Sequence, residues 1–311
     1  MDRPQDNSIS KQAQAFLDAL PPFEDRSQLP LNGSADEWRA VQDMVEERMR
    51  PACEKARQYH NARITEIGAG PLRALVIAPE TVNQTATPAI YLHGGGYTCY
   101  SARSSLFASI PLAAAIGRPL VSLDYPLAPF SACHLTVRLT AAAMKDVLQR
   151  FSGASLIGES AGGGLALSAV NDLGGQDFQP RSLILISPWT DLANRGESRT
   201  AMAEHDPILQ YEPGLRVCAQ AYAGNRLDSP DASPLFADYD HAYPPCLILC
   251  GSCEILLSDS RRLHEKLKTA NAESALEVYK GMFHSFPILA PDLPESEYAM
   301  RSMKAFLDSR S

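Results

Sequence analysis

From residue 89 onward, short apolar runs alternate with segments of helical periodicity, and this alternation limits the fold to one class. The apolar runs are AIYL (89–92), PLVSLDY (119–125), ASLIG (154–158), SLILIS (182–187), PCLILC (245–250) and ALEVYK (275–280). Helical segments lie around 104–116, 135–150, 161–173, 258–270 and 295–308. Continuous apolar strands separated by helices indicate a mostly parallel sheet that is covered on both faces. The pattern therefore predicts an α/β fold.

The chain before residue 89 has two different hydrophobic patterns, one typical of strands and one typical of helices. ARITEI and LRALVIAP predict a first strand pair with its turn at 68–71, which brings the sheet to about eight strands. Residues 1–60 predict helices: Ser34 and Glu37 have the spacing of a capping box. After them an apolar stripe falls at helical intervals, formed by Trp38, Val41, Val45, Met49 and Ala52. We expect a helical cap segment over 1–60, an α/β domain over 61–311, and a cap insertion over 193–230.

Composition excludes several classes of partner. The net charge of −8 and the lack of a basic stripe argue against nucleic-acid binding. No run approaches the roughly 18 apolar residues of a membrane span, and the polar start MDRPQDNSISKQ lacks the apolar region of a secretion signal. The seven cysteines are an odd number scattered through apolar stretches, which suits reduced thiols. We expect a cytoplasmic protein.

A serine between two glycines follows the third apolar run. Gly158-Glu159-Ser160-Ala161-Gly162 comes after ASLI and before a helix, which is the context of a nucleophile elbow. In open α/β sheets, ligands bind beyond the carboxyl ends of the strands. A packing turn rich in glycine would have the same local sequence, so the serine needs partners elsewhere in the chain.

The chain contains candidates for the partners that a catalytic serine needs: an oxyanion hole, a general base and an acid. The run His93-Gly94-Gly95-Gly96 follows the strand AIYL, and its bare backbone can bring N–H groups close to a developing oxyanion. His93 more naturally orients this loop than titrates. His284 follows the last strand and is the best candidate for the general base. Glu254 lies just beyond the strand PCLILC, three residues after Gly251, and is favoured as the acid, whereas Asp259 lies where it would naturally cap the next helix.

With these residues in place, the chain resembles the hormone-sensitive-lipase group of carboxylesterases of the α/β-hydrolase fold. The resemblance rests on HGGG (93–96), GESAGG (158–163), DYPLAP (124–129), SPWTDL (187–192), DPIL (206–209), SPLFAD (233–238), GSCEILLSDS (251–260) and GMFHSF (281–286). It implies Ser160 as nucleophile, Glu254 as acid and His284 as base. The oxyanion donors would be the N–H groups of Gly95, Gly96 and Ala161.

The activity implied is hydrolysis of short- to medium-chain acyl esters without metal or other cofactor. The same machinery could instead serve a lactone hydrolase or a deacetylase of a small metabolite, and a non-catalytic small-molecule receptor is a third alternative. Tyr97 and Phe283 are candidate walls of the substrate pocket. The pair Cys250 and Cys253 has redox or zinc spacing but no second Cys/His pair to complete a site, so buried thiols are the better interpretation. The resemblance also allows a homodimer.

Overall fold

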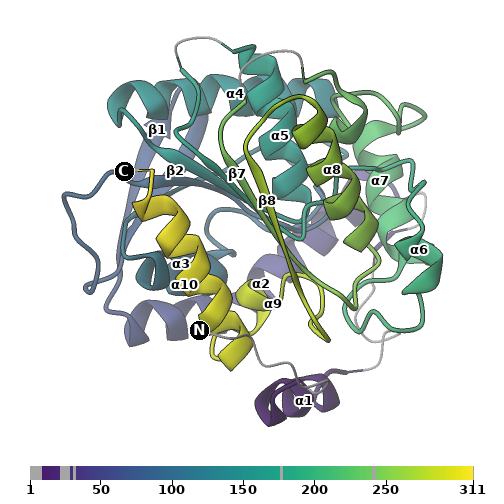
Figure 1. Ribbon diagram of the computed structural model, residues 1–311, viewed down its shortest axis with the longest axis horizontal. Coiled ribbons are helices and arrows are strands. Elements are labelled where there is room, and N and C mark those ends of the chain that lie inside the picture. Colours follow the sequence, from purple (N-terminus) through teal and green to yellow (C-terminus); the bar gives the residue numbers. More distant parts are fainter. Residues whose placement is uncertain (1–8, 22–28, 31–32, 176–177, 240–242, 311) are drawn as a thin grey trace.

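The computed structural model of the protein describes residues 9–21, 29–30, 33–175, 178–239 and 243–310. At its centre lies one eight-stranded sheet with the order β1-β2-β4-β3-β5-β6-β7-β8 (Figure 1). β2 is antiparallel to both of its neighbours, and the pairs from β4 to β8 are parallel. The strands are β1 (Arg63–Ala69), β2 (Leu72–Ala78), β3 (Ala89–Leu92), β4 (Leu120–Leu123), β5 (Ser155–Glu159), β6 (Leu183–Ile186), β7 (Cys246–Gly251) and β8 (Ser274–Tyr279). The predicted α/β class and mostly parallel sheet are confirmed.

Helices cover both faces of this sheet (Figure 1). The α-helices of the described residues are α1 (Lys11–Asp18), α2 (Ala35–Tyr59), α3 (Leu106–Ile116), α4 (Cys133–Arg150), α5 (Ala161–Leu173), α6 (Ser198–Ala201), α7 (Arg216–Ala223), α8 (Leu257–Thr269), α9 (Phe286–Leu289) and α10 (Pro294–Asp308). Buried residues of α4, α5 and α8 form one apolar cluster with the sheet, and those of α3 and α10 form a second cluster on the opposite face. The sheet is therefore the middle of three layers.

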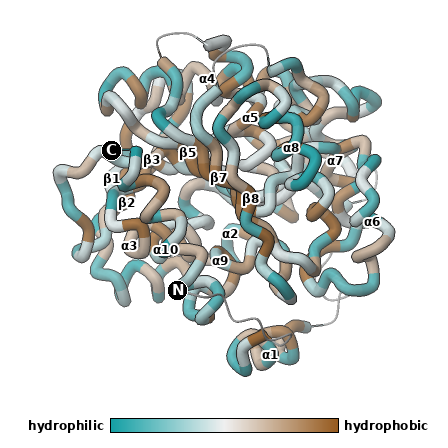
Figure 2. The backbone as a smooth tube through the Cα atoms, viewed as in Figure 1, coloured by the Kyte–Doolittle hydropathy of each residue, from teal (hydrophilic) through white to brown (hydrophobic). Residues whose placement is uncertain are grey.

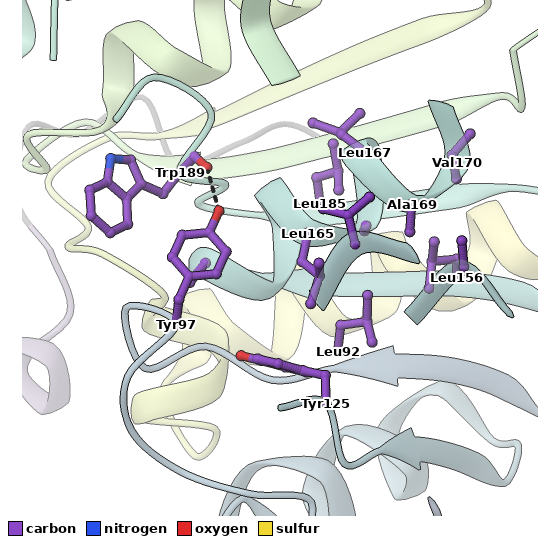
Figure 3. Packing of buried hydrophobic residues seen from close by; sticks show 14 of the residues in the cluster. Leu92, Tyr97, Tyr125, Leu156, Leu165, Leu167, Ala169, Val170, Leu185 and Trp189 are labelled. Atoms are coloured by element: carbon purple, nitrogen blue, oxygen red, sulfur yellow. Dashed lines mark hydrogen bonds between the residues drawn. The ribbon is translucent and has the colours of Figure 1, made fainter. Parts of the chain in front are cut away.

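Side chains of each central strand alternate between these two clusters. In β6, Leu183 and Leu185 belong to the first cluster, whereas Ile184 and Ile186 belong to the second. Because both directions are apolar, the strand reads as one continuous hydrophobic run. Figure 2 shows the central strands as hydrophobic segments between helices of mixed hydropathy, and Figure 3 shows part of the first cluster, including Leu185.

The helix α2 begins with the predicted capping box. The Ser34 hydroxyl accepts from the Glu37 amide, and the Glu37 carboxylate accepts from the Ser34 amide at 2.7 Å. The apolar stripe differs from prediction at its end, because Ala52 is exposed and Cys53 is buried in its place. Four turns of a helix with 3.6 residues per turn span about 14.4 residues, so the inward direction, counted from Trp38, falls between positions 52 and 53.

Two further segments differ from or refine the predictions. The turn between the first strands is shorter than predicted, because Gly68 and Ala69 still pair in register with Arg73 and Leu72. Residues 193–230 contain α6, an irregular turn (Tyr211–Leu215) and α7. Across the described ranges, no helix is long and apolar enough to cross a membrane.

Candidate active site

Ser160 lies in a strained turn between β5 and α5. Its backbone has φ 53° and ψ −118°, a conformation that non-glycine residues rarely adopt. A Cβ at Gly162 would collide with the carbonyl oxygens of Leu92 and His93, and one at Gly158 would collide with the carbonyl oxygen of Gly162. Only glycine therefore fits on both sides of the serine, and the turn holds its hydroxyl beyond the carboxyl edge of the sheet.

His284 meets this hydroxyl from the loop after β8. Its Nε2 lies 3.0 Å from Ser160 Oγ, although 124 residues separate the two in sequence. Burial alone would lower the pKa of His284, but the nearby negative charges of Glu254, Asp206 and Glu159 outweigh burial and raise the pKa above its usual value. The imidazole of His284 is therefore hydrogen-bonded to Ser160 and lies near three carboxylates.

Glu254 lies on the other side of the imidazole. Its Oε1 is 3.9 Å from His284 Nδ1, longer than a hydrogen bond, and neither atom has another partner among the residues described. The second oxygen, Oε2, accepts from the Ser187 hydroxyl at 2.8 Å and from the Gly251 amide at 3.0 Å. The carboxylate is therefore fixed through one oxygen, and the other faces the ring.

Asp259, the alternative acid, is directed elsewhere. Its Oδ2 accepts from the backbone amides of Thr190 and Asp191, both at 2.8 Å. Complete burial raises its pKa to about 7. The prediction that Asp259 caps a helix is wrong, because α8 begins at Leu257 and the carboxylate instead holds the loop after β6.

The glycine loop faces Ser160 with backbone in the left-handed region. Gly95 has φ 100° and Gly96 has φ 62°, and both line the same cavity as Ser160. Within the described ranges, the N–H groups of Gly95, Gly96 and Ala161 donate no hydrogen bond to the protein. Behind the loop, His93 Nδ1 lies 2.8 Å from the Gly94 carbonyl, and burial lowers the pKa of His93 to about 4. A neutral His93 that orients the loop agrees with the sequence-based expectation.

Glu159, next to the serine, joins the loops of the site. Its Oε2 accepts from the Gly94 amide at 2.7 Å, and its Oε1 accepts from the Ser285 hydroxyl at 2.6 Å. The Ser285 amide in turn donates to the Ser187 hydroxyl oxygen at 3.0 Å. One carboxylate thus fixes both the glycine loop and the histidine loop. This role could not be predicted from the residues around Glu159, because its partners lie 65 and 126 residues away in the chain.

Asp206 is a second acidic group that the sequence did not mark as functional beyond its DPIL motif. It accepts from the amides of Ile208, Leu209 and Ile255 at 2.8–2.9 Å. Burial raises its pKa to about 6, and the charge of His284 opposes that rise. Asp206 therefore connects the insertion to the residue after Glu254 and adds negative charge near His284.

The cavity above Ser160 has a volume of about 280 Å³. Its walls come from the glycine loop, from one face of α2 and from residues 193–230. The lining residues of α2 are Val41, Met44, Val45 and Arg48. The lining residues of the insertion are Ile208, Leu209, Gln210, Gly214, Leu215 and Cys218. Tyr97 and Phe283, the predicted walls, are not among them. Tyr97 stacks on Tyr222 at 3.9 Å and lies against Trp189 (Figure 3), and Phe283 stacks on Phe16 at 5.1 Å, so both pack inside the fold.

Among the described residues, no group of three or more His, Cys, Asp or Glu side chains is placed to hold an ion. Cys250 and Cys253 are free thiols, and burial together with the Glu254 charge raises the pKa of Cys250. The chemistry available here is that of a hydroxyl, an imidazole, a carboxylate and backbone amides.

Comparison with known proteins agrees with this architecture. Residues 89–288 match the sequence profile of a family with the α/β-hydrolase fold. An acetyl-hydrolase of Streptomyces hygroscopicus is 33% identical over 222 residues, which are 70% of this chain and 74% of that protein. An esterase of Acinetobacter venetianus is 30% identical over 252 residues, 77% of this chain and 81% of that protein. The crystal structure of an esterase from the bacterial hormone-sensitive lipase family is 30% identical and superposes with a TM-score of 0.75 over 89% of this chain and 99% of that chain.

Both the family match, which spans most of the chain, and the relatives at 30% identity or more point the same way. The predicted resemblance and the predicted enzyme class are confirmed. The chain belongs to the α/β-hydrolase-fold family, in its hormone-sensitive-lipase group, and is a carboxylic-ester hydrolase.

Proposed function

We propose that the protein is a serine carboxylesterase in which Ser160 is the nucleophile, His284 the general base and Glu254 the acid. The observation that carries the proposal is the 3.0 Å contact between Ser160 Oγ and His284 Nε2, at the bottom of a cavity lined by unpaired glycine-loop amides. An alcohol becomes an effective nucleophile when an adjacent base takes its proton. A receptor on an inactive scaffold would not need this contact.

In the proposed reaction, Ser160 Oγ attacks the ester carbonyl while His284 Nε2 takes the hydroxyl proton. The carbonyl oxygen becomes an oxyanion, which accepts from the N–H groups of Gly95, Gly96 and Ala161; one such donor is worth about 3 kcal/mol in a comparable site. His284 then protonates the leaving alkoxide, and an acyl-enzyme remains. Water then attacks the acyl-enzyme carbonyl while His284 takes its proton, and His284 returns that proton to Ser160 Oγ as the carboxylic acid is released.

Glu254 would stabilise the imidazolium that forms in each step. The 3.9 Å gap to Nδ1 supports this role because both atoms lack other partners in the described part of the chain. Hydrogen bonds of a resting site are often long and shorten when substrate binds. Asp259 accepts hydrogen bonds from the loop after β6, which supports a structural role for this residue instead of a catalytic one.

The size of the cavity favours small substrates. About 280 Å³ lies at the lower limit of ligand pockets, so we propose esters with short to medium acyl chains. The name of the Streptomyces relative, an acetyl-hydrolase, supports a small acyl group. Helix α2 and residues 193–230 supply the walls above the sheet, which supports their role as a cap.

The proposal is tested with p-nitrophenyl butyrate and a fluorophosphonate probe. We expect wild-type protein to hydrolyse the ester and to take one probe per chain at Ser160, and Ser160→Ala to lose both while keeping its circular dichroism spectrum. Glu254→Gln should lower kcat by about a thousandfold, since an amide no longer stabilises the imidazolium, whereas Asp259→Asn should lower it far less. Turnover retained by Ser160→Ala, or a larger loss from Asp259→Asn, would overturn the respective assignments.

A further inference from the structure

Three of the four arginines of α2 form ion pairs within the helix, and the fourth, Arg48, does not. Arg39, Arg50 and Arg57 each form an ion pair with the acidic residue three positions earlier, at 3.1, 2.5 and 2.7 Å. Such pairs are the usual way in which a helix surface holds its charges. Arg48 has Val45 at that position, and Met44, Pro51 and Ala52 occupy its other neighbouring positions on the helix surface. Its own helix offers Arg48 no acid.

Arg48 also lies on the face of α2 that lines the cavity. It follows Val41, Met44 and Val45 at helical spacing, and these four side chains form one wall of the space above Ser160. Within the residues described, Arg48 has no ion-pair partner. Three apolar side chains thus lead along the wall to one unpaired guanidinium.

The segment of α2 that carries Arg48 is held in place by hydrogen bonds of two neighbouring side chains, Gln42 and Glu46. The Gln42 side-chain amide donates to the carbonyl oxygens of Thr98 and Ala128 at 2.9 and 3.2 Å. The Glu46 carboxylate accepts from the hydroxyls of Ser101 and Ser104. Glu46 is therefore engaged with the loop after the glycine run and does not neutralise Arg48. The helix backbone that carries Arg48 is held against the same loop that faces the serine.

The other charged side chains of the cavity lining are already engaged. Glu159 uses one oxygen for the Gly94 amide and the other for the Ser285 hydroxyl, and His284 faces Ser160. Arg48 is then the charged group of the described lining that is free to bind a ligand. Because the chain carries a net charge of −8, an anion is not attracted by the protein as a whole, and a local cation is needed to hold it.

We propose that the enzyme prefers esters that carry a carboxylate or another anionic group remote from the scissile bond, and that Arg48 binds this group at the mouth of the cavity. The inference rests on the proposed esterase function. The apolar residues of the same wall would contact the methylene chain between the ester and the anion. Arginine suits such a group because its planar guanidinium donates two parallel hydrogen bonds to a carboxylate.

The test uses two matched pairs of esters, one for each arm of the substrate. Monomethyl adipate and methyl hexanoate differ only by a carboxylate on the acyl arm, and 6-acetoxyhexanoate and hexyl acetate differ only by a carboxylate on the alcohol arm. For each pair, the ratio of kcat/KM for the charged ester to that for the neutral ester is measured at pH 8. We expect this ratio in Arg48→Gln to fall about tenfold on one arm, equivalent to about 1.4 kcal/mol, mainly through KM.

Further variants separate charge from packing. Arg48→Lys should keep part of the preference, Arg48→Glu should lower the ratio further, and 0.5 M NaCl should lower it in wild type but not in Arg48→Gln. Arg50→Gln, on the same helix and paired with Glu47, is the matched control and should leave the ratio unchanged. An unchanged ratio in Arg48→Gln on both arms, or an equal change in Arg50→Gln, would overturn the inference. If wild type hydrolysed none of these esters or p-nitrophenyl butyrate, the proposed function itself would fail.

Discussion

The hydroxyl of Ser285 donates a 2.6 Å hydrogen bond to Oε1 of Glu159, which joins the residue after the candidate base to the residue before the candidate nucleophile. The other oxygen of Glu159 holds the Gly94 amide. Glu159 is a buried residue, so replacing these partners with water would cost free energy. The distance between Ser160 and His284 thus depends on a group that takes no part in the proposed proton transfers.

We predict that Ser285→Ala weakens catalysis without abolishing it. Loss of a hydrogen bond to a charged acceptor costs about 1.5–3 kcal/mol, and we expect kcat to fall about tenfold with a smaller change in KM, because the imidazole is positioned less well. Ser302→Ala is the matched control: Ser302 also donates to a glutamate, Glu277, at 2.7 Å, but neither residue lines the cavity above Ser160. Equal kinetics in Ser285→Ala and wild type would show that Glu159 does not position the histidine loop.

The pH dependence should follow the negative groups around His284. The base acts when neutral, and its pKa is raised above the usual 6.5, so kcat/KM should decline on the acid side with a midpoint above pH 6.5. Asp206→Asn removes one of the charges that raise the pKa and should move this midpoint to lower pH. The asparagine also presents an NH₂ group to one of the amides that Asp206 binds, so the maximal rate will fall too, but the midpoint reports the charge. A midpoint unchanged by Asp206→Asn would contradict this account.

Asp259 should make stability fall as pH rises. Its folded pKa of about 7 exceeds its unfolded value of about 4, so the folded state binds the proton more tightly. The penalty for ionising the buried carboxyl is absent below pH 4 and grows until pH 7. Relative to wild type, Asp259→Asn should therefore gain stability between pH 4 and pH 8, by about 4 kcal/mol at most. Urea unfolding at the two pH values measures this gain, and parallel pH curves for the two proteins would contradict it.

The strands and most helices were predictable because their signals are local. The run of β6 is apolar on both faces and lies between helices, which leaves little choice of structure. The end of the stripe in α2 was mispredicted at Ala52 because a small error in helical phase accumulates with length, and alanine and cysteine are equally acceptable to a pattern of apolar residues. Element boundaries depend on such small differences, whereas element types do not.

The candidate site was predictable only where glycine patterns mark it. The elbow and the glycine loop need residues without Cβ atoms, and that need is visible in the sequence around Ser160. The roles of Glu159 and Asp259 depend on partners in distant loops, and nothing in their neighbouring residues distinguishes a loop anchor from a helix cap. Tyr97 was expected at the pocket because it adjoins the glycine loop, but its φ of 65° turns the ring toward Tyr222. Proximity in sequence does not determine which side of a tight loop a side chain takes.

Helix α1 packs against the loop that carries His284. The ring of Phe16 stacks on Phe283 with centroids 5.1 Å apart and planes at 9°. Ile9 contacts Gly281 so closely that a Cβ there would collide with it. The amide and hydroxyl of Ser10 donate to the two carboxylate oxygens of Glu295 in α10, at 2.7 and 2.9 Å. In Figure 1, α1 lies at the lower edge of the molecule, near α9.

An eight-residue helix is too short to be stable alone, so α1 must depend on these contacts for its structure. We predict that Phe16→Ala loosens α1 and, with it, the histidine loop, because the aromatic pair contributes about 1 kcal/mol beyond its buried area. Amide hydrogen exchange should accelerate in residues 11–18 and 281–286, and kcat should fall severalfold, while the exchange of the central strands stays unchanged. Phe16→Leu keeps apolar area without the ring and should give a smaller change of the same kind. Faster exchange confined to α1, with normal exchange in 281–286, would mean that the histidine loop holds its conformation without this helix.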